Sequence, residues 1–202
     1  MTNYIHKGDI PKDLNFSAEV AVDTETTGLN INRDRLCVVQ LSDGNGDSHV
    51  IQMMNLYEAP RLVHLFQNPE ILKIFHFARF DLGVILKYLN TACFPVYCTK
   101  IASKLSRTNT DRHGLKDLCR DLIGIELSKQ QQSSDWAADE LTKEQIDYAA
   151  SDVLYLHQIK EKMDKLLIRE KRVNLAEGCF KFLPNLAKLD VAGWQSENIF
   201  SH

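Results

Sequence analysis

The segment Val20-Ala-Val-Asp-Thr-Glu-Thr-Thr-Gly-Leu29 decides the organisation that we expect for this chain. Its small and β-branched first residues are typical of a buried strand, which residues 26–28 would end. Residues two apart on a strand point to the same face, so Asp23 and Glu25 would project together, roughly 6.6 Å apart along the strand. Such a pair is either a solvated edge or a site where a cation neutralises the repulsion, and carboxylates suit Mg²⁺ or Mn²⁺.

The overall composition is that of a globular protein. The 202 residues are 44% hydrophobic and 25% charged, which suits one domain of ordinary size. No apolar run approaches the roughly 20 residues of a membrane span, and the first residues lack the apolar stretch of a signal peptide. We therefore expect a cytoplasmic protein without a membrane partner.

The net charge and the cysteines bear on which ligands the protein could bind. The formal net charge of −3 argues mildly against a binder of long duplexes and is neutral about a short oligonucleotide. The five cysteines include no C-x-x-C pair, and most have apolar neighbours. We interpret them as reduced core residues and therefore do not expect a zinc site.

The hydrophobic pattern predicts an α/β fold. Strands are expected at residues 19–24, 35–41, 48–52, 72–75 and 94–97, the first three pairing antiparallel. Helices are expected at residues 56–66, 78–89, 99–105, 114–123 and 142–170. Thr142 and Gln145 have capping-box form at the start of the last helix. Strands first, with helices around and after them, favour a mixed sheet covered on both faces.

Two further acids lie where a site could use them. Asp81 follows the strand at 72–75, in the first turns of a helix, where an acid also suits the helix dipole without any function. Tyr148 and Asp152 are four residues apart and share one helix face. The alternative for this pair is a tyrosine hydroxyl bonded to an acid at a helix surface.

Three segments together resemble the exonuclease motifs of the DEDD superfamily, in the family's order. They are Val22-Asp-Thr-Glu-Thr-Thr-Gly-Leu29, His76-Phe-Ala-Arg-Phe-Asp81 and Tyr148-Ala-Ala-Ser-Asp152. The Y-x-x-x-D form of the third resembles the DEDDy subgroup that includes ribonuclease D, and the likeness covers roughly residues 18–168. It implies a ribonuclease H-like mixed β-sheet flanked by helices, the DnaQ-like exonuclease fold, in a domain at residues 1–170.

The remaining residues, 171–202, are expected to form a C-terminal extension. They leave no room for the helical nucleic-acid-binding domains that usually follow in ribonuclease D, and this short form resembles the nanoRNase C family. That family forms rings and clears very short RNA, dinucleotides included. The resemblance implies a homo-oligomer, with a ring-shaped octamer as one candidate form. The extension would pack on its own domain or on a neighbouring subunit, and the resemblance favours the subunit contact.

The resemblance also implies a reaction. It is the metal-dependent 3′-5′ hydrolysis of short single-stranded RNA to nucleoside 5′-monophosphates, with two divalent cations, Mg²⁺ or Mn²⁺. Asp23, Glu25 and Asp152 would hold the cation that carries the attacking water. Asp23 would bridge to the second cation, with Asp81 contributing directly or through water. Tyr148 would orient the water, since an unperturbed tyrosine pKa near ~10 does not suit a base.

Substrate contacts follow from the same resemblance. Leu29 matches the position where an apolar side chain wedges between the last two bases, and backbone groups near Thr26 would meet the 3′-hydroxyl. His76 and Arg79 could touch phosphate, with core packing and a surface ion pair as their alternatives. His113 lies before a predicted helix start, where phosphate would be favourable; a solvated helix start is the alternative, and the residue alone favours it.

Two alternatives to a dinucleotide-clearing enzyme remain. The same chemistry could act on longer RNA, such as tRNA 3′ ends, or on DNA 3′ ends. A different class of protein would keep the exonuclease fold as an inactive binding module. Such modules typically lose one or more metal carboxylates, and this chain keeps all four acids and the tyrosine.

Overall fold

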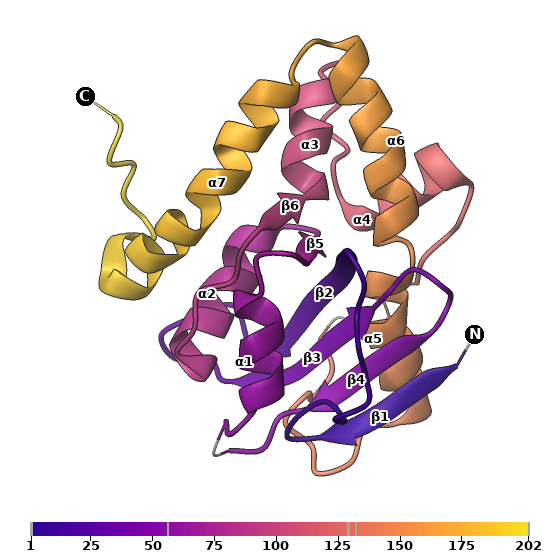
Figure 1. The fold of residues 1–202 in the computed structure, drawn as a ribbon, viewed down its shortest axis with the longest axis vertical. Coiled ribbons are helices and arrows are strands. Elements are labelled where there is room, and N and C mark those ends of the chain that lie inside the picture. The colour runs from indigo at the N-terminus through magenta and orange to yellow at the C-terminus, as the bar shows by residue number, and fades with distance from the viewer. Residues whose placement is uncertain (1, 56, 129, 132, 202) are drawn as a thin grey trace.

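A six-stranded sheet forms the centre of the computed structural model, which describes residues 2–55, 57–128, 130–131 and 133–201. Its strand order is β1-β4-β3-β2-β5-β6 (Figure 1). The strands are β1 (Asn3–Lys7), β2 (Glu19–Thr26), β3 (Leu36–Ser42), β4 (Ser48–Gln52), β5 (Leu72–Phe75) and β6 (Val96–Cys98). The predicted antiparallel pairing of the first three predicted strands, β2, β3 and β4, is confirmed.

The other strands make the sheet mixed. β5 pairs parallel to β2, β6 parallel to β5, and β1 parallel to β4. Strand β1 was not predicted, because its residues are half-exposed at an edge and carry no run of buried apolar side chains. Strand β2 continues two residues beyond the predicted end, with a register shift against β3 between Glu25 and Thr26.

Helices cover both faces of the sheet, as predicted. They are α1 (Pro60–Gln67), α2 (Ala78–Leu89), α3 (Thr99–Ser106), α4 (Leu115–Leu118), α5 (Lys143–Leu154), α6 (Leu156–Arg169) and α7 (Val173–Leu189), with π-helical turns η1 (Cys119–Ile123) and η2 (Asp190–Trp194). Successive side chains of a strand point to opposite faces of the sheet, and the two faces contribute to two separate hydrophobic cores. Val39 and Ile51 belong to the large core that includes α1 and α2. Val38 and Val50 belong to a smaller core with Ala149 of α5.

Several helix predictions needed correction. The helix predicted from residue 56 begins at Pro60, whose fixed φ suits a first turn, and residue 56 itself lies outside the described residues. The helix predicted at 142–170 is two helices that meet at Tyr155. They separate because α5 packs on β2, β3 and β4, whereas α6 packs on α3 and β5. The capping box of Thr142 and Gln145 is present.

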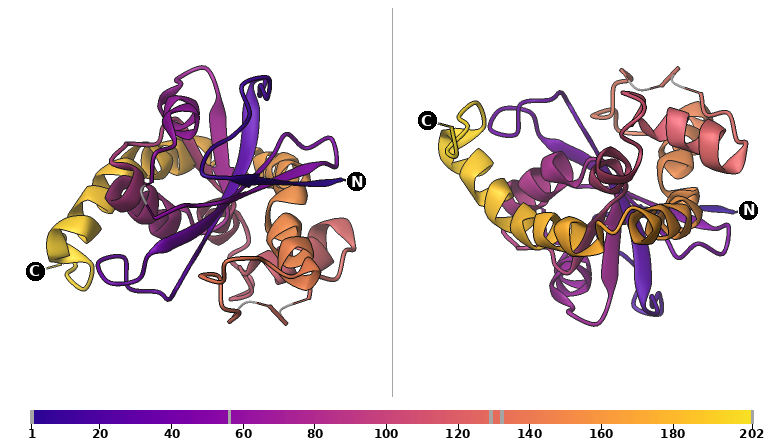
Figure 2. Two further views of the ribbon diagram at one scale, coloured as in Figure 1. Left: turned by 90° about the horizontal axis from the view of Figure 1, so that it is seen from below. Right: turned by 90° about the horizontal axis from the view of Figure 1, so that it is seen from above.

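The C-terminal helix α7 packs along α2 and borders β6, at the side of the molecule away from the N-terminus (Figures 1 and 2). Its buried residues belong to the large core and are Ala176, Phe180, Leu183 and Ala187. The division of the chain at residue 170 stays a prediction. Within the described part of the chain, no helix combines the length and apolar character needed to cross a membrane.

Candidate active site

Strand β2 directs two carboxylates to the face that α5 covers. In the antiparallel register with β3, Asp23 lies opposite Gln40 and Glu25 lies opposite Val38. Directly opposed residues share a face, and Val38 belongs to the core beneath α5. Asp152 on α5 completes this arrangement: one oxygen from each of Asp23, Glu25 and Asp152 lies within 4.8 Å of the others.

The fourth acid reaches the cluster from the other side of β2. Strand β5 pairs with β2 only from Glu19 to Ala21, and beyond that point the chain turns into α2, which carries Asp81. Thr24 faces away from the α5 side and donates a 2.7 Å hydrogen bond from Oγ1 to Asp81 Oδ1. Asp81 is 3% exposed. The structure thus brings together the four acids singled out in the sequence.

Burial disfavours ionisation of all four acids, and repulsion by neighbouring acids adds to it for Asp23, Glu25 and Asp81. Burial raises the pKa of Asp23 well above its ordinary value, and the next cause is the charge of Asp81. Burial, followed by the charge of Asp152, raises the pKa of Glu25 to about 9. The pKa values of Asp81 and Asp152 rise to about 7, again chiefly through burial.

The donor set fits a divalent cation. None of the ion pairs found among the described residues includes these four carboxylates. Close carboxylates without a positive partner are stable in the charged form only if a cation joins them, and oxygen ligands are those that Mg²⁺ and Mn²⁺ prefer. Opposite Asp23, the buried amide of Gln40 has no hydrogen-bond partner among the described residues. Unused hydrogen-bonding capacity therefore lies beside the acids.

Tyr148 lies one helical turn before Asp152. Its ring centroid is 6.0 Å from that of Trp136. Burial raises the pKa of Tyr148, and the charges of Asp152 and Glu25 raise it further. The hydroxyl is therefore protonated at neutral pH and can donate a hydrogen bond; its role in orienting water stays a prediction.

A cleft of about 630 Å³ opens over the acids. Leu29 and Thr26 line it; Leu29 is 81% exposed, and the Thr26 hydroxyl donates to the carbonyl of Gly28. His76 also lines it, but its Nδ1 lies 2.9 Å from Thr99 Oγ1, and burial lowers its pKa to about 3. His76 is therefore neutral, so any contact with phosphate would be through a neutral ring.

Phe77 and Lys100 are among the cleft residues that the sequence interpretation missed. Phe77 is 47% exposed at φ 71°, a conformation that is uncommon for a bulky residue. The ammonium of Lys100 lies 4.1 Å from the centre of the Phe77 ring and also lines the cleft. Phe77 could have been identified from its place in the second motif, whereas nothing in the sequence marks Lys100.

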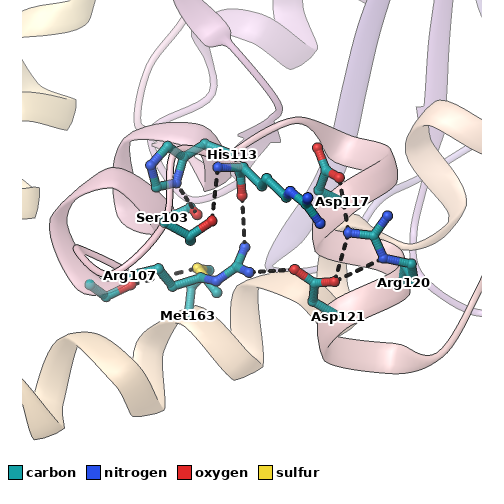
Figure 3. A network of polar contacts seen from close by, with 10 residues as sticks. Ser103, Arg107, His113, Asp117, Arg120, Asp121 and Met163 are labelled. Carbon is teal, nitrogen blue, oxygen red and sulfur yellow. Dashed lines mark hydrogen bonds and ion pairs between the residues drawn. The ribbon is translucent and has the colours of Figure 1, made fainter.

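Arg79 and His113, both predicted substrate contacts, do not line the cleft. Arg79 binds Asp190, so it has the ion-pair arrangement considered as its alternative. His113 Nδ1 lies 2.8 Å from Ser103 Oγ (Figure 3). Beside it, Arg107 donates to the carbonyl of Arg112 and to Asp121 Oδ2. Both residues thus have protein partners in this geometry.

Residues 5–168 match a family model described as a 3′-5′ exonuclease. The chain belongs to the 3′-5′ exonuclease family. The chain is 32% identical to ribonuclease D of Acidiphilium cryptum (strain JF-5) over 155 residues, which are 77% of this chain and 39% of that protein. The chain spans about 40% of the length of this and the next curated relative that it matches.

Two solved structures are similar along the whole exonuclease chain. Brucella melitensis NrnC with bound Mg²⁺ has 51% identity and a TM-score of 0.96, with all of both chains covered. Brucella melitensis NrnC bound to pGG has 52% identity and a TM-score of 0.97, covering 100% of this chain and 99% of that one. These similarities confirm the resemblance to ribonuclease D and the short nanoRNase C form, and the predicted DnaQ-like α/β fold.

Proposed function

We propose that this exonuclease is a metal-dependent 3′-5′ exoribonuclease that hydrolyses short RNA, dinucleotides included, to nucleoside 5′-monophosphates. One observation carries the proposal: four acids from three distant segments and a protonated tyrosine surround one cleft. The similarity to an NrnC bound to pGG supports a short substrate. So does the cleft volume of about 630 Å³, which is in the range of small-ligand pockets rather than of a long channel.

The carboxylates would hold two Mg²⁺ or Mn²⁺ ions, with Asp23, Glu25 and Asp152 as one ligand set and Asp81 beside Asp23. Bound there, such cations neutralise the scissile phosphate and activate the attacking water. The Tyr148 hydroxyl holds that water in line by donating or accepting a hydrogen bond. Gathering four acids around one point has no evident structural benefit, since their repulsion opposes folding.

Residues at the mouth of the cleft would hold the substrate. The exposed Leu29 side chain separates the last two bases, and backbone groups near Thr26 bind the terminal 3′-hydroxyl. Lys100 and Lys116, both at the cleft, supply positive charge for phosphate. They offset locally a chain that carries a formal net charge of −3.

A homo-oligomer is part of the same proposal. A mostly apolar groove of about 670 Å³ lies where α6 and α7 meet the edge strand β6. Ile168 lines it and is 66% exposed. An exposed apolar groove of this kind is typical of a surface that another chain covers. A second copy of this chain is the partner that the resemblance favours.

Substrate length is the test. We would measure hydrolysis of 5′-labelled RNA and DNA oligonucleotides of two to twenty residues at equal concentration, with and without EDTA. The proposal expects the fastest turnover on RNA dinucleotides, single-nucleotide steps from the 3′ end, and no hydrolysis in EDTA. A 20-mer trimmed much faster than a dinucleotide would instead support trimming of longer RNA, and a preference for DNA would overturn the RNA assignment.

A further inference from the structure

Two residues near the C-terminus, Asp190 and Gln195, form hydrogen bonds with Arg79 of α2, the helix that carries Asp81. Arg79 Nε donates to Asp190 Oδ2 at 2.7 Å, and Arg79 Nη2 donates to Asp190 Oδ1 at 2.6 Å. The same Nη2 donates to the carbonyl of Gln195 at 3.1 Å. This two-pronged geometry is the strongest that arginine makes with a carboxylate. It joins two segments that are 111 residues apart in the sequence.

Burial makes this contact costly to lose. Asp190 is 1% exposed, and Arg79 is the partner of both its oxygens. Beside Asp190, the pKa of Arg79 rises, chiefly through their hydrogen bonds. The Arg79 side chain is 36% exposed, so the penalty for an uncompensated buried charge applies to Asp190 when Arg79 is removed, whereas an Arg79 without Asp190 is partly solvated. The described segment around Asp190 is therefore fixed against α2.

Contacts with residues outside α2 stabilise the first turn of this helix. Phe77, at its N-cap, makes no side-chain capping hydrogen bond and adopts φ 71°, so the turn begins from a strained residue. Asp81 lies in that turn, two residues after Arg79. Its carboxylate receives one side-chain hydrogen bond, from Thr24 on β2. The turn is thus held between β2 on one side and Asp190 on the other.

We infer that Asp190 is a positioning residue for metal binding: through Arg79 it holds the first turn of α2 so that Asp81 lies beside Asp23. The inference rests on the proposed function, because it assumes that these acids bind the cations. Groups that hydrogen-bond directly to a metal ligand typically change metal affinity 10–100-fold when they are removed; Asp190 acts one contact further out, so we expect the lower end of that range. The C-terminal segment, 111 residues beyond the second motif, would then be part of the catalytic apparatus.

Asp190→Asn tests the inference in the full-length protein, with Mn²⁺ as the probe. We expect the Mn²⁺ dissociation constant, measured calorimetrically, to rise about tenfold. Hydrolysis of an RNA dinucleotide should recover at saturating Mn²⁺, since the change affects metal affinity rather than the reacting groups. Unchanged Mn²⁺ affinity with a lowered melting temperature would show a purely structural contact and overturn the inference.

Two further variants keep the test decisive. Arg79→Lys retains the charge but offers one contact instead of two, and should raise the Mn²⁺ dissociation constant by a smaller factor; an unchanged value in this variant also overturns the inference. Glu177→Gln removes the exposed ion pair with Lys181 on α7, 3.9 Å long, and should leave Mn²⁺ affinity unaltered. If the wild-type chain itself neither binds Mn²⁺ nor hydrolyses RNA, the proposed function fails instead.

Discussion

Two hollows of similar volume differ in chemistry, and the difference indicates where the reaction takes place. The cleft over β2 measures about 630 Å³ and the groove beside β6 about 670 Å³. In the groove, charged residues form pairs: Lys160 lies 3.0 Å from Asp164, and Lys181 lies 3.9 Å from Glu177. In the cleft, Asp23 is surrounded by other acids that raise its pKa. Uncompensated charge, rather than volume, distinguishes the candidate active site.

Asp23→Ala should have the largest effect. Asp23 is the acid on which the charges of the other three converge, so its loss should lower the hydrolysis rate by about 10³-fold or more. The metal-free protein should not melt at a lower temperature, because the substitution removes repulsion. The matched control is Asp164→Asn in the groove, which should leave hydrolysis unaffected. Hydrolysis retained in Asp23→Ala would contradict the assignment.

Tyr148→Phe should have a smaller effect, confined to turnover. The ring and its contact with Trp136 remain, so only the hydroxyl that orients water is lost. We expect kcat to fall about 10²-fold while Mn²⁺ affinity stays the same. Kinetics together with calorimetry would check this, and an equal loss of metal affinity would indicate that Tyr148 is structural.

The cleft also predicts a pH dependence of stability. The folded-state pKa of Glu25 is about 9 against an ordinary 4.5, and the pKa values of Asp81 and Asp152 are about 7 against 3.8. Groups with raised folded pKa values bind more protons when folded, so their contribution is present at low pH and is lost as pH rises. The metal-free melting temperature should therefore fall between about pH 4 and pH 9.

Divalent cations should reverse that fall, because they replace the protons. The rise in melting temperature on adding Mg²⁺ should be larger at pH 8 than at pH 5. Differential scanning fluorimetry across pH, with Ca²⁺-free buffers and an EDTA control, would measure both effects. In Asp23→Ala the Mg²⁺ effect should largely disappear. A metal-free protein equally stable at pH 5 and pH 8 would argue against the crowded acids.

Ile168→Glu should have the smallest effect on chemistry. None of the described residues that line the groove also lines the cleft, so hydrolysis of a dinucleotide per active site should change less than about twofold if the site is complete within one chain. Placing a charge in the apolar groove should weaken the proposed self-association. Light scattering after size exclusion would report a lower molar mass. An unchanged mass would exclude the groove as the contact between copies.

The sequence was most informative where structure is local. Residues 72–75, 78–89 and 48–52 have the predicted bounds, because periodic burial and turn residues determine each segment by itself. The four acids and Tyr148 were identified through motif resemblance, and the fold brings them together. Periodicity alone placed Asp23 and Glu25 on one face, but could not say which helix would meet them.

What the sequence could not supply depends on long-range contact. Strand β1 is half-exposed and is held by pairing with β4, so its own pattern carries little signal. The break at Tyr155 follows from two different packing partners, not from a helix-breaking residue. Asp190 and Arg79 meet across 111 residues, and no spacing rule connects them.

Anomalous X-ray diffraction from crystals grown with Mn²⁺ would test the central claim most directly. The account predicts a Mn²⁺ peak coordinated by Asp23, Glu25 and Asp152 at about 2.1–2.2 Å, with a second peak near Asp23 and Asp81 when an RNA 3′ end is bound. An active enzyme whose crystals hold Mn²⁺ elsewhere, with these four carboxylates free of metal, would contradict it.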